Sequence, residues 1–322
     1  MGWVHINPRS RETLHGRGVV SPSEFLRLPG VILCGHPDRH VLRVGLSARN
    51  DESAILKKEH RVPWRDRLAN ALAGFGFVSK STREAIVLER ALQAGIACPE
   101  VIAHGQEGGR AFLMLTEKSG ATDLRVYISR FPNRLRGDAK RLGHAVARMH
   151  AAGFLHGDLY AKHIVVDADE KIFILDWQQA RQYKTLSWKA RCNDVAALDA
   201  TLSESLLSNR VRLMFLHAYR IASGANSVGT FAKAAKHIRA ISLKLARKSR
   251  IQDMRQLPLP HGTQNLVWLD GEAMCVTQRF YREFGGHAPD WLQFRSTSSF
   301  FVKTTRVALS EGPLIRLCLS VH

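Results

Sequence analysis

Two aspartates stand in segments that suit phosphoryl transfer. Asp158 lies in His156-Gly-Asp158, after a long amphipathic stretch, and Asp176 follows farther on, at the end of a short apolar run. Transfer of a phosphoryl group needs a positioned alcohol whose proton is accepted, and metal ions held over the phosphates. A carboxylate in a loop suits the first task, and one at a strand end suits the second. We therefore expect Asp158 to be the catalytic base and Asp176 to bind the metal.

The two segments match part of the kinase signature, in which H-R-D-L-x-x-x-N precedes D-F-G. Gly157 replaces the arginine, His163 stands at the asparagine position, and Trp177-Gln178 replaces Phe-Gly. Mg²⁺ prefers hard oxygen ligands, so the imidazole of His163 is a poor substitute for an asparagine carbonyl. We expect His163 to line the site.

A kinase also needs a lysine on a strand of its first lobe and a glutamate on the next helix to hold that lysine. Lys57 and Lys58 both lie in one strand-like segment, and we prefer Lys58. On the helix expected over residues 82–94, Glu84 is the better candidate and Glu89 the competitor. The order lysine, glutamate, aspartate, aspartate is that of a kinase chain. A G-x-G-x-x-G phosphate loop is missing from the sequence.

The elements that must position these residues change character near the polar stretch 116–120, which predicts a hinge. Before it, the pattern predicts an antiparallel sheet with one main helix. After it come a strong amphipathic helix over 138–152, two short strands, and a helical pattern from 195 to about 255. Leu257-Pro-Leu-Pro260 breaks that pattern, and strand-like segments return beyond it.

Composition sets wider limits. The chain has 322 residues, of which 45% are hydrophobic and 23% charged, and this excludes a disordered chain. No apolar run approaches the roughly 20 residues that cross a bilayer, and the first residues lack a signal-peptide core. Five scattered cysteines without a C-x-x-C pair favour a reducing cytoplasm, and argue against a disulfide framework, a disulfide-linked partner or a zinc site.

The net charge of +19 predicts an anionic partner. Basic residues follow Asp176 and suit an acceptor that carries phosphates or carboxylates: Arg181, Lys184, Lys189 and Arg191. A second basic cluster lies on one helix, and each of its cations is worth about 1 kcal/mol near an anionic membrane: Lys233, Lys236, Arg239, Lys244, Arg247, Lys248 and Arg250. Aromatic residues are not interleaved with the cations, so nucleic acid is not an expected partner.

The chain resembles the lipopolysaccharide core kinase family, which groups the WaaP and Kdo kinases with InaA-like relatives. The resemblance covers residues 31–255. It is carried by 56–60, Arg83-Glu84, 112–117, 158–163, 175–181 and 193–198. It implies a bilobal protein-kinase-like α+β fold, with an antiparallel β-rich N-lobe, a helical C-lobe and a small β-rich C-terminal appendage. The expected domains are residues 1–117, 118–256 and 257–322.

The same resemblance implies a role for each candidate residue and for ATP and Mg²⁺ as cofactors. Lys58 would contact the ATP phosphates, and Glu84 would orient it. Thr116, Glu117 and Lys118 would present backbone groups to adenine. Asp194 would anchor the catalytic loop from a buried helix, and His156 would be a packed structural residue.

The expected activity is phosphorylation of heptose or Kdo in the lipopolysaccharide inner core, in the cytoplasm and peripherally at the inner face of the inner membrane. Two alternatives stay open. One is a small-molecule phosphotransferase of the aminoglycoside or choline kinase type, which shares His156-Gly-Asp-Leu and Leu175-Asp-Trp. The other is a catalytically inactive kinase-like module that binds polyanions.

Overall fold

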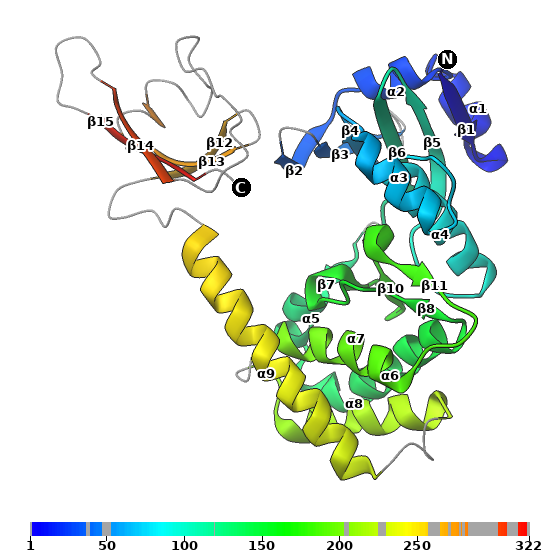
Figure 1. The fold of residues 1–322 in the computed structure, drawn as a ribbon, viewed down its shortest axis with the longest axis vertical. Coiled ribbons are helices and arrows are strands. Elements are labelled where there is room, and N and C mark those ends of the chain that lie inside the picture. Colours follow the sequence, from blue (N-terminus) through cyan, green and yellow to red (C-terminus); the bar gives the residue numbers. More distant parts are fainter. Residues whose placement is uncertain are drawn as a thin grey trace. The chain divides into compact units, whose positions relative to one another are not determined.

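The computed structural model describes residues 2–36, 39–46, 53–118, 120–202, 206–224, 230–256, 265–269, 272–276, 278, 281–282, 302–307 and 315–320. The chain divides into two compact units. One comprises residues 1–30 and 43–247, and the other residues 31–42 and 248–322. The first unit holds both lobes of the fold apart from residues 31–42 and 248–256 (Figure 1). The division of the chain at residues 117 and 256 stays a prediction.

The first lobe is an antiparallel sheet with helices around it. Its six strands have the order β1-β5-β6-β4-β3-β2. The strands are β1 (Trp3–Ile6), β2 (Val31–His36), β3 (Arg39–Gly45), β4 (Ser53–Glu59), β5 (Val101–Glu107) and β6 (Arg110–Thr116). The helices are α1 (Arg11–His15), α2 (Pro22–Arg27), α3 (Trp64–Leu72) and α4 (Lys80–Gln93).

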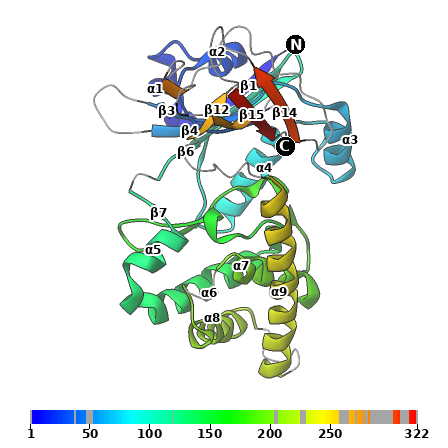
Figure 2. The ribbon, with the colours of Figure 1, turned by 90° about the vertical axis from the view of Figure 1, so that its left-hand side faces the viewer.

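Helix α4 shows why this lobe holds together. Ser79 caps its first turn by accepting from the Thr82 backbone N–H at 3.1 Å. Leu88 and other apolar residues at helical spacing are fully buried against β5 and β6. The helix ends before Gly95, which adopts φ +73°, a conformation that other residues rarely take. Figures 1 and 2 show α4 on the side of the sheet lobe that faces the helical lobe.

The second lobe is mainly helical, with short strands between its helices. Its helices are α5 (Leu124–Arg130), α6 (Leu135–Ala151), α7 (Trp188–Ala200), α8 (Asn209–Ala222) and α9 (Phe231–Gln256). Its strands are β7 (Thr122–Asp123), β8 (Phe154–Leu155), β9 (Ile164–Val166), β10 (Ile172–Ile174) and β11 (Arg181–Gln182). Helices α6 and α8 pack closely because Gly143 carries no side chain. A Cβ there would lie 2.7 Å from the Phe215 carbonyl oxygen.

The second unit contains an antiparallel sheet of order β12-β13-β15-β14. Its strands are β12 (Asn265–Leu269), β13 (Glu272–Val276), β14 (Val302–Val307) and β15 (Ile315–Ser320). The expected break at residues 257–260 lies outside the described residues. Four paired strands are present, as expected for a β-rich C-terminal part.

The α+β kinase-like fold is confirmed, with a sheet-rich first lobe followed by a helical one. The sequence did not predict β1, α1 or α2. Strand β1 has four residues with no buried side chain, so its alternating pattern is weak. None of the helices in the described residues is long and apolar enough to cross a membrane.

Candidate active site

Lys57, Glu84 and Asp176 form an ion-paired cluster where the two lobes meet. Nζ of Lys57 donates to Oε1 of Glu84 at 2.6 Å and lies 3.5 Å from Oδ1 of Asp176. The Glu84 side chain is fully buried, the Lys57 side chain is 10% exposed and that of Asp176 is 40% exposed. A buried carboxylate must be paired to stay charged, so Glu84 holds the ammonium in place. The carboxylate of Asp176 stays accessible from solvent.

The preference for Lys58 was wrong, because the residue beside Glu84 and Asp176 is Lys57. Successive side chains of a strand point to opposite faces of the sheet. Lys58 pairs in register with Phe112, on which Phe25 stacks at 4.3 Å, so its side chain faces helix α2. There its Nζ donates to the Leu28 carbonyl at 2.7 Å. Burial lowers the pKa of the Lys58 ammonium.

Asp176 has a backbone conformation that few residues adopt. Its φ of 59° and ψ of 67° lie in the left-handed region. Asp enters this region more easily than most residues, and such outliers concentrate at functional sites. The next side chain, Trp177, is fully buried and donates from Nε1 to the Ile174 carbonyl at 2.8 Å. This anchor fixes the turn that presents the carboxylate.

Asp158 lies in the loop between β8 and a short 3₁₀ helix (Ala161–His163). Its carbonyl oxygen accepts from the Tyr160 backbone N–H at 2.8 Å and lies 2.8 Å from Nδ1 of His163. Burial, and hydrogen bonding to the Asp158 carboxylate, raise the pKa of the Tyr160 hydroxyl. Asp158 is half-buried. Its carboxylate accepts a hydrogen bond from the Tyr160 phenol, which stays protonated.

Asp194 in helix α7 holds the loop that carries Asp158 through two hydrogen bonds. Its Oδ2 accepts from the His156 backbone N–H at 2.7 Å, and its Oδ1 from that of Gly157 at 3.0 Å. Nε2 of the buried His150 lies 3.3 Å from Oδ2. Sequence reasoning did not include His150, although its place on the inner face of an amphipathic helix was a usable signal. A single buried carboxylate thus fixes two successive amides of the loop.

His156 is fully buried, and burial lowers its pKa. Its Nε2 lies 3.0 Å from the Leu175 carbonyl oxygen, and its ring makes an edge contact with Trp177 at 5.4 Å. The residue therefore links the loop that carries Asp158 to the strand end that carries Asp176. This position suits a packed histidine that supports the site.

His163 faces Asp176. The contact between Nδ1 and the Asp158 carbonyl assigns the proton to Nδ1, because a carbonyl can only accept. Nε2 lies 3.5 Å from Oδ2 of Asp176, so a nitrogen and an oxygen that can each bind a cation face each other. The exposed Asp176 carboxylate supplies the oxygen that Mg²⁺ prefers, so the residues present fit a divalent cation.

The segment expected to face adenine, residues 116–118, follows strand β6. The Thr116 backbone N–H donates to the Glu100 carbonyl at 3.0 Å, and that of Glu117 to the Ser53 carbonyl at 3.3 Å. The Glu117 side chain accepts a hydrogen bond from Nε of Arg43 at 2.9 Å. Within the described residues, the Lys118 amide makes no hydrogen bond to another residue. Lys118 is therefore the member of this segment whose N–H can serve a ligand.

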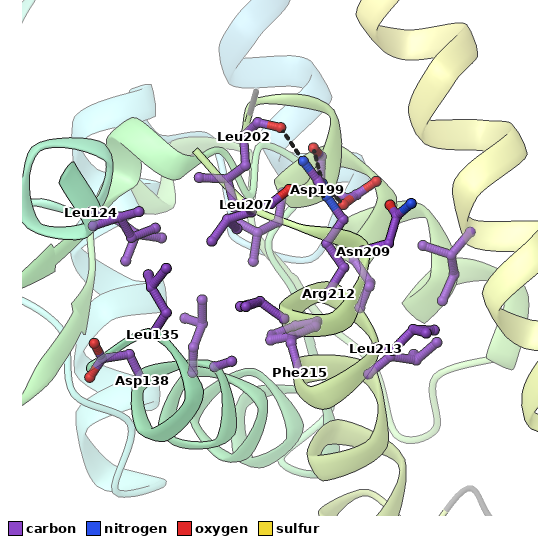
Figure 3. Close-up of a pocket in the computed structure, with 18 of the residues that line it drawn as sticks. Leu124, Leu135, Asp138, Asp199, Leu202, Leu207, Asn209, Arg212, Leu213 and Phe215 are labelled. Carbon is purple, nitrogen blue, oxygen red and sulfur yellow. Dashed lines mark hydrogen bonds and ion pairs between the residues drawn. The ribbon is translucent and has the colours of Figure 1, made fainter. Parts of the chain in front are cut away.

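A separate cavity of about 590 Å³ lies within the helical lobe (Figure 3). Helices α5 to α9 line it, mainly with aliphatic and aromatic side chains such as Leu124, Leu202 and Phe215. Arg212 crosses one side, where it pairs with Asp199 and donates to the Leu202 carbonyl at 2.7 Å. None of the sequence-predicted catalytic or cofactor-binding residues lines this cavity. Its composition suits an apolar ligand.

The fold and site define a protein of the protein-kinase-like class. Residues 50–219 match the model of the lipopolysaccharide kinase (Kdo/WaaP) family, and the chain belongs to that family. A structure of WaaP in complex with acyl carrier protein has the same fold. It aligns with a TM-score of 0.51 and 20% identity, over 74% of this chain and 99% of that one.

Two curated proteins match over shorter stretches. The 3-deoxy-D-manno-octulosonic acid kinase of Vibrio parahaemolyticus is 34% identical over 53 residues, which are 16% of this chain and 22% of that protein. A probable bifunctional tRNA threonylcarbamoyladenosine biosynthesis protein of Methanothermobacter thermautotrophicus is 28% identical over 119 residues, 37% of this chain and 20% of that one. The chain thus spans about a fifth of the length of each relative.

Proposed function

We propose that the protein is an ATP-dependent kinase that phosphorylates a sugar, heptose or Kdo, of the lipopolysaccharide inner core. The observation that carries the proposal is the Lys57–Glu84–Asp176 cluster in a chain of the lipopolysaccharide kinase family. Within this cluster the buried Lys57 ammonium is held by Glu84 and lies beside the more exposed carboxylate of Asp176. That arrangement meets the needs of phosphoryl transfer, in which positioned charges do most of the work.

Each residue has a distinct task in this proposal. Lys57 neutralises phosphate oxygens of ATP, and Glu84 keeps its ammonium oriented. Asp158 accepts the proton of the attacking sugar hydroxyl. Asp176, beside His163, would hold Mg²⁺, which supplies positive charge to the phosphates when bound. The amide of Lys118 is the donor proposed for adenine.

The proposed acceptor is an anionic glycan, because the segment after Asp176 is basic on its surface. Arg181, Lys184 and Lys189 are exposed there, and Arg191 is half-buried. Phosphates or carboxylates of an inner-core saccharide would be attracted to these cations. Aminoglycosides and choline are positively charged, so these cations would repel such acceptors.

The test is phosphate transfer from ATP to purified core oligosaccharide, followed by mass spectrometry of the glycan. Asp158→Asn keeps the shape of the side chain and removes its basicity, so we expect a loss of at least about 100-fold in turnover. Asp169→Asn, at an exposed carboxylate of the same lobe, should leave turnover unchanged. In cells without the gene, the core should lack one phosphate. Unchanged core phosphate, with ATP left intact by the purified protein, would contradict the proposal.

The cavity in the helical lobe supports a second partner, an acyl carrier protein. The matched WaaP structure holds one, and the cavity offers an apolar space for a hydrocarbon chain. We expect acylated carrier protein to bind more tightly than its unacylated form. Replacing Leu202 by Arg should remove that difference and leave nucleotide binding intact. Equal binding of both forms by the unchanged protein would rule out the cavity as the site.

A further inference from the structure

Two histidines and a glutamate converge on the sheet lobe, at a place that the proposed phosphoryl transfer does not use. His5 on β1 and His104 on β5 are directly opposite each other in the antiparallel register. Their rings lie 5.3 Å apart. Glu89 reaches the pair from α4, and one ligand atom of each residue lies within 4.8 Å of the others.

His104 gives a second, independent indication of a ligand. The residue is only 7% exposed, and its buried Nδ1 has no hydrogen-bond partner among the described residues. A buried polar nitrogen without a partner is costly and rare. Burial, together with the charge of His5, lowers the pKa of His104 to about 4, so the imidazole is neutral in ordinary buffers. Neutral imidazole is the form that binds metals.

We propose that His5, Glu89 and His104 bind one divalent transition-metal ion of the zinc class. Two imidazole nitrogens and one carboxylate oxygen are a ligand set that suits zinc, whereas Mg²⁺ and Ca²⁺ prefer oxygen alone. The expectation against a zinc site rested on the cysteines, and this set uses none of them.

The geometry needs a small adjustment that the site allows. Bonds of about 2.0–2.2 Å place tetrahedral ligand atoms roughly 3.4 Å apart, so separations of up to 4.8 Å must close by up to about 1.4 Å. His104 is held by an edge contact with Trp3 at 5.4 Å and would stay fixed. His5 is exposed and Glu89 is half-buried, so these two side chains are able to rotate toward it.

A hollow of about 430 Å³ adjoins the cluster and gives room for a fourth ligand from solvent. His5 and Glu89 line it, together with Asn7, Arg9 and Glu100. The positive charge of Arg9 opposes a cation there, and the carboxylates of Glu89 and Glu100 offset it. An accessible position next to three protein ligands is the arrangement of an open zinc site.

The ion would tie together three elements that are distant in sequence. Among the described strands, β1 is at the edge of the sheet and pairs with β5. A metal bridge from β1 and β5 to α4 would add a link to the helix that also carries Glu84. Because the ion binds the folded state, it should raise the melting temperature.

The experiment uses the full chain, dialysed against a chelator and titrated with Zn²⁺ by calorimetry, with Co²⁺ as a spectroscopic probe. We expect one tightly bound ion, a higher melting temperature and the visible absorption of tetrahedral Co²⁺. His5→Asn and Glu89→Gln change groups that are not fully buried and should still fold. Each should weaken Zn²⁺ binding at least about 10- to 100-fold, the range found even for residues that only support a ligand.

Matched controls separate this site from other metal-binding groups. His144→Asn and Glu12→Gln remove an exposed histidine and an exposed glutamate elsewhere and should keep the bound ion. Asp176→Asn should keep it as well, which separates this site from the active site and from the proposed function. Failure of the unchanged protein to bind Zn²⁺, or equal binding by His5→Asn, would overturn the proposal.

Discussion

At the scale of single residues, the site depends on which face of strand β4 each lysine occupies. Lys57 pairs in register with Leu113, whose side chain belongs to the core under α4, and Lys58 pairs with Phe112 on the other face. A shift of one residue along a strand therefore moves a charge from one side of the sheet to the other. The two lysines are both buried, but they have different partners: Glu84 for Lys57 and the Leu28 carbonyl for Lys58.

This difference predicts different effects of two neighbouring substitutions on turnover. Lys57→Met removes the cation beside Asp176, so turnover should fall by about 100- to 1,000-fold. It also leaves the buried Glu84 carboxylate without this partner, so the free energy of unfolding should fall as well. Lys58→Met leaves the Leu28 carbonyl without its donor, so it should cost about 1–3 kcal/mol of unfolding free energy and change turnover little. Kinase assays and denaturant titrations on both variants measure this. If Lys58→Met lost turnover and Lys57→Met kept it, Lys57 would not be the lysine of the active site.

The cysteines also differ in a way that alkylation can detect. Burial raises the pKa of Cys98 to about 12 and that of Cys192 to about 11. Only about one Cys98 side chain in ten thousand would then be a thiolate at pH 8, and the thiolate is the reactive form. Cys34 is exposed. Iodoacetamide followed by peptide mapping should modify Cys34 before Cys98 and Cys192. Labelling of Cys98 in native protein as fast as in denaturant would contradict its burial.

At the scale of elements, buried polar contacts join segments that are far apart in sequence. Arg83 in α4 donates to the Ala180 carbonyl at 3.0 Å, so the helix that carries Glu84 also holds the segment after Asp176. Burial lowers the pKa of this guanidinium. Helix α7 reaches the catalytic loop through Asp194, and the loop reaches β10 through His156. The site is thus positioned by helices on both sides of it.

The anchoring of the loop by Asp194 predicts a large effect of a small change. Asp194→Asn keeps the volume but replaces one carboxylate oxygen by an amide donor, so one of the two loop N–H groups loses its acceptor. We expect a loss of about 1–3 kcal/mol in unfolding free energy, together with lower turnover because Asp158 is less well placed. Asp199→Asn is not a suitable control, since Asp199 also pairs with arginines. Asp169→Asn serves better. Wild-type stability of Asp194→Asn would contradict the proposed anchor.

At the scale of the whole molecule, the chain carries a net charge of +19. Some of its exposed cations lie on one side of helix α9. Ala234 and Ile238 are buried, and Ile241 and Leu245 pack against the core. Lys233, Lys236, Lys244 and Arg247 are exposed. Arg239 differs from them, because it lies 3.3 Å from Asp199. An anionic surface would meet four cations along one side of this helix.

These exposed cations predict salt-dependent binding to vesicles that contain anionic lipid. Each is worth about 1 kcal/mol near such a surface, so each Lys→Gln or Arg→Gln change should weaken binding about fivefold at low salt. Binding should fall as salt is raised, because exposed charges are screened. A matched variant changes four exposed arginines of the sheet lobe and should bind more tightly than the α9 variant: Arg11, Arg61, Arg65 and Arg110. Equal loss in both variants would assign the effect to net charge alone.

Much of this protein follows from its sequence alone. The order of lysine, glutamate and two aspartates, the amphipathic helices and the alternating strands are local patterns. They predicted a sheet-rich first part and a helical second part, and the family resemblance implied the bilobal kinase-like fold. Glu84 was preferred over Glu89 from its place in the helix, and it is the residue that meets a lysine. The packed role expected for His156 agrees with its complete burial.

Only the tertiary structure shows which side chains from distant segments meet. The choice between Lys57 and Lys58 required the two faces of β4 to be known, because both residues have the same chemistry and adjacent positions. The pairing of His5 with His104 joins residues almost a hundred positions apart, through a strand that its sequence marks only weakly. Local patterns record periodicity and chemical type. Contacts between distant segments depend on register and on the packing of helices against the sheet, and only the folded chain fixes those.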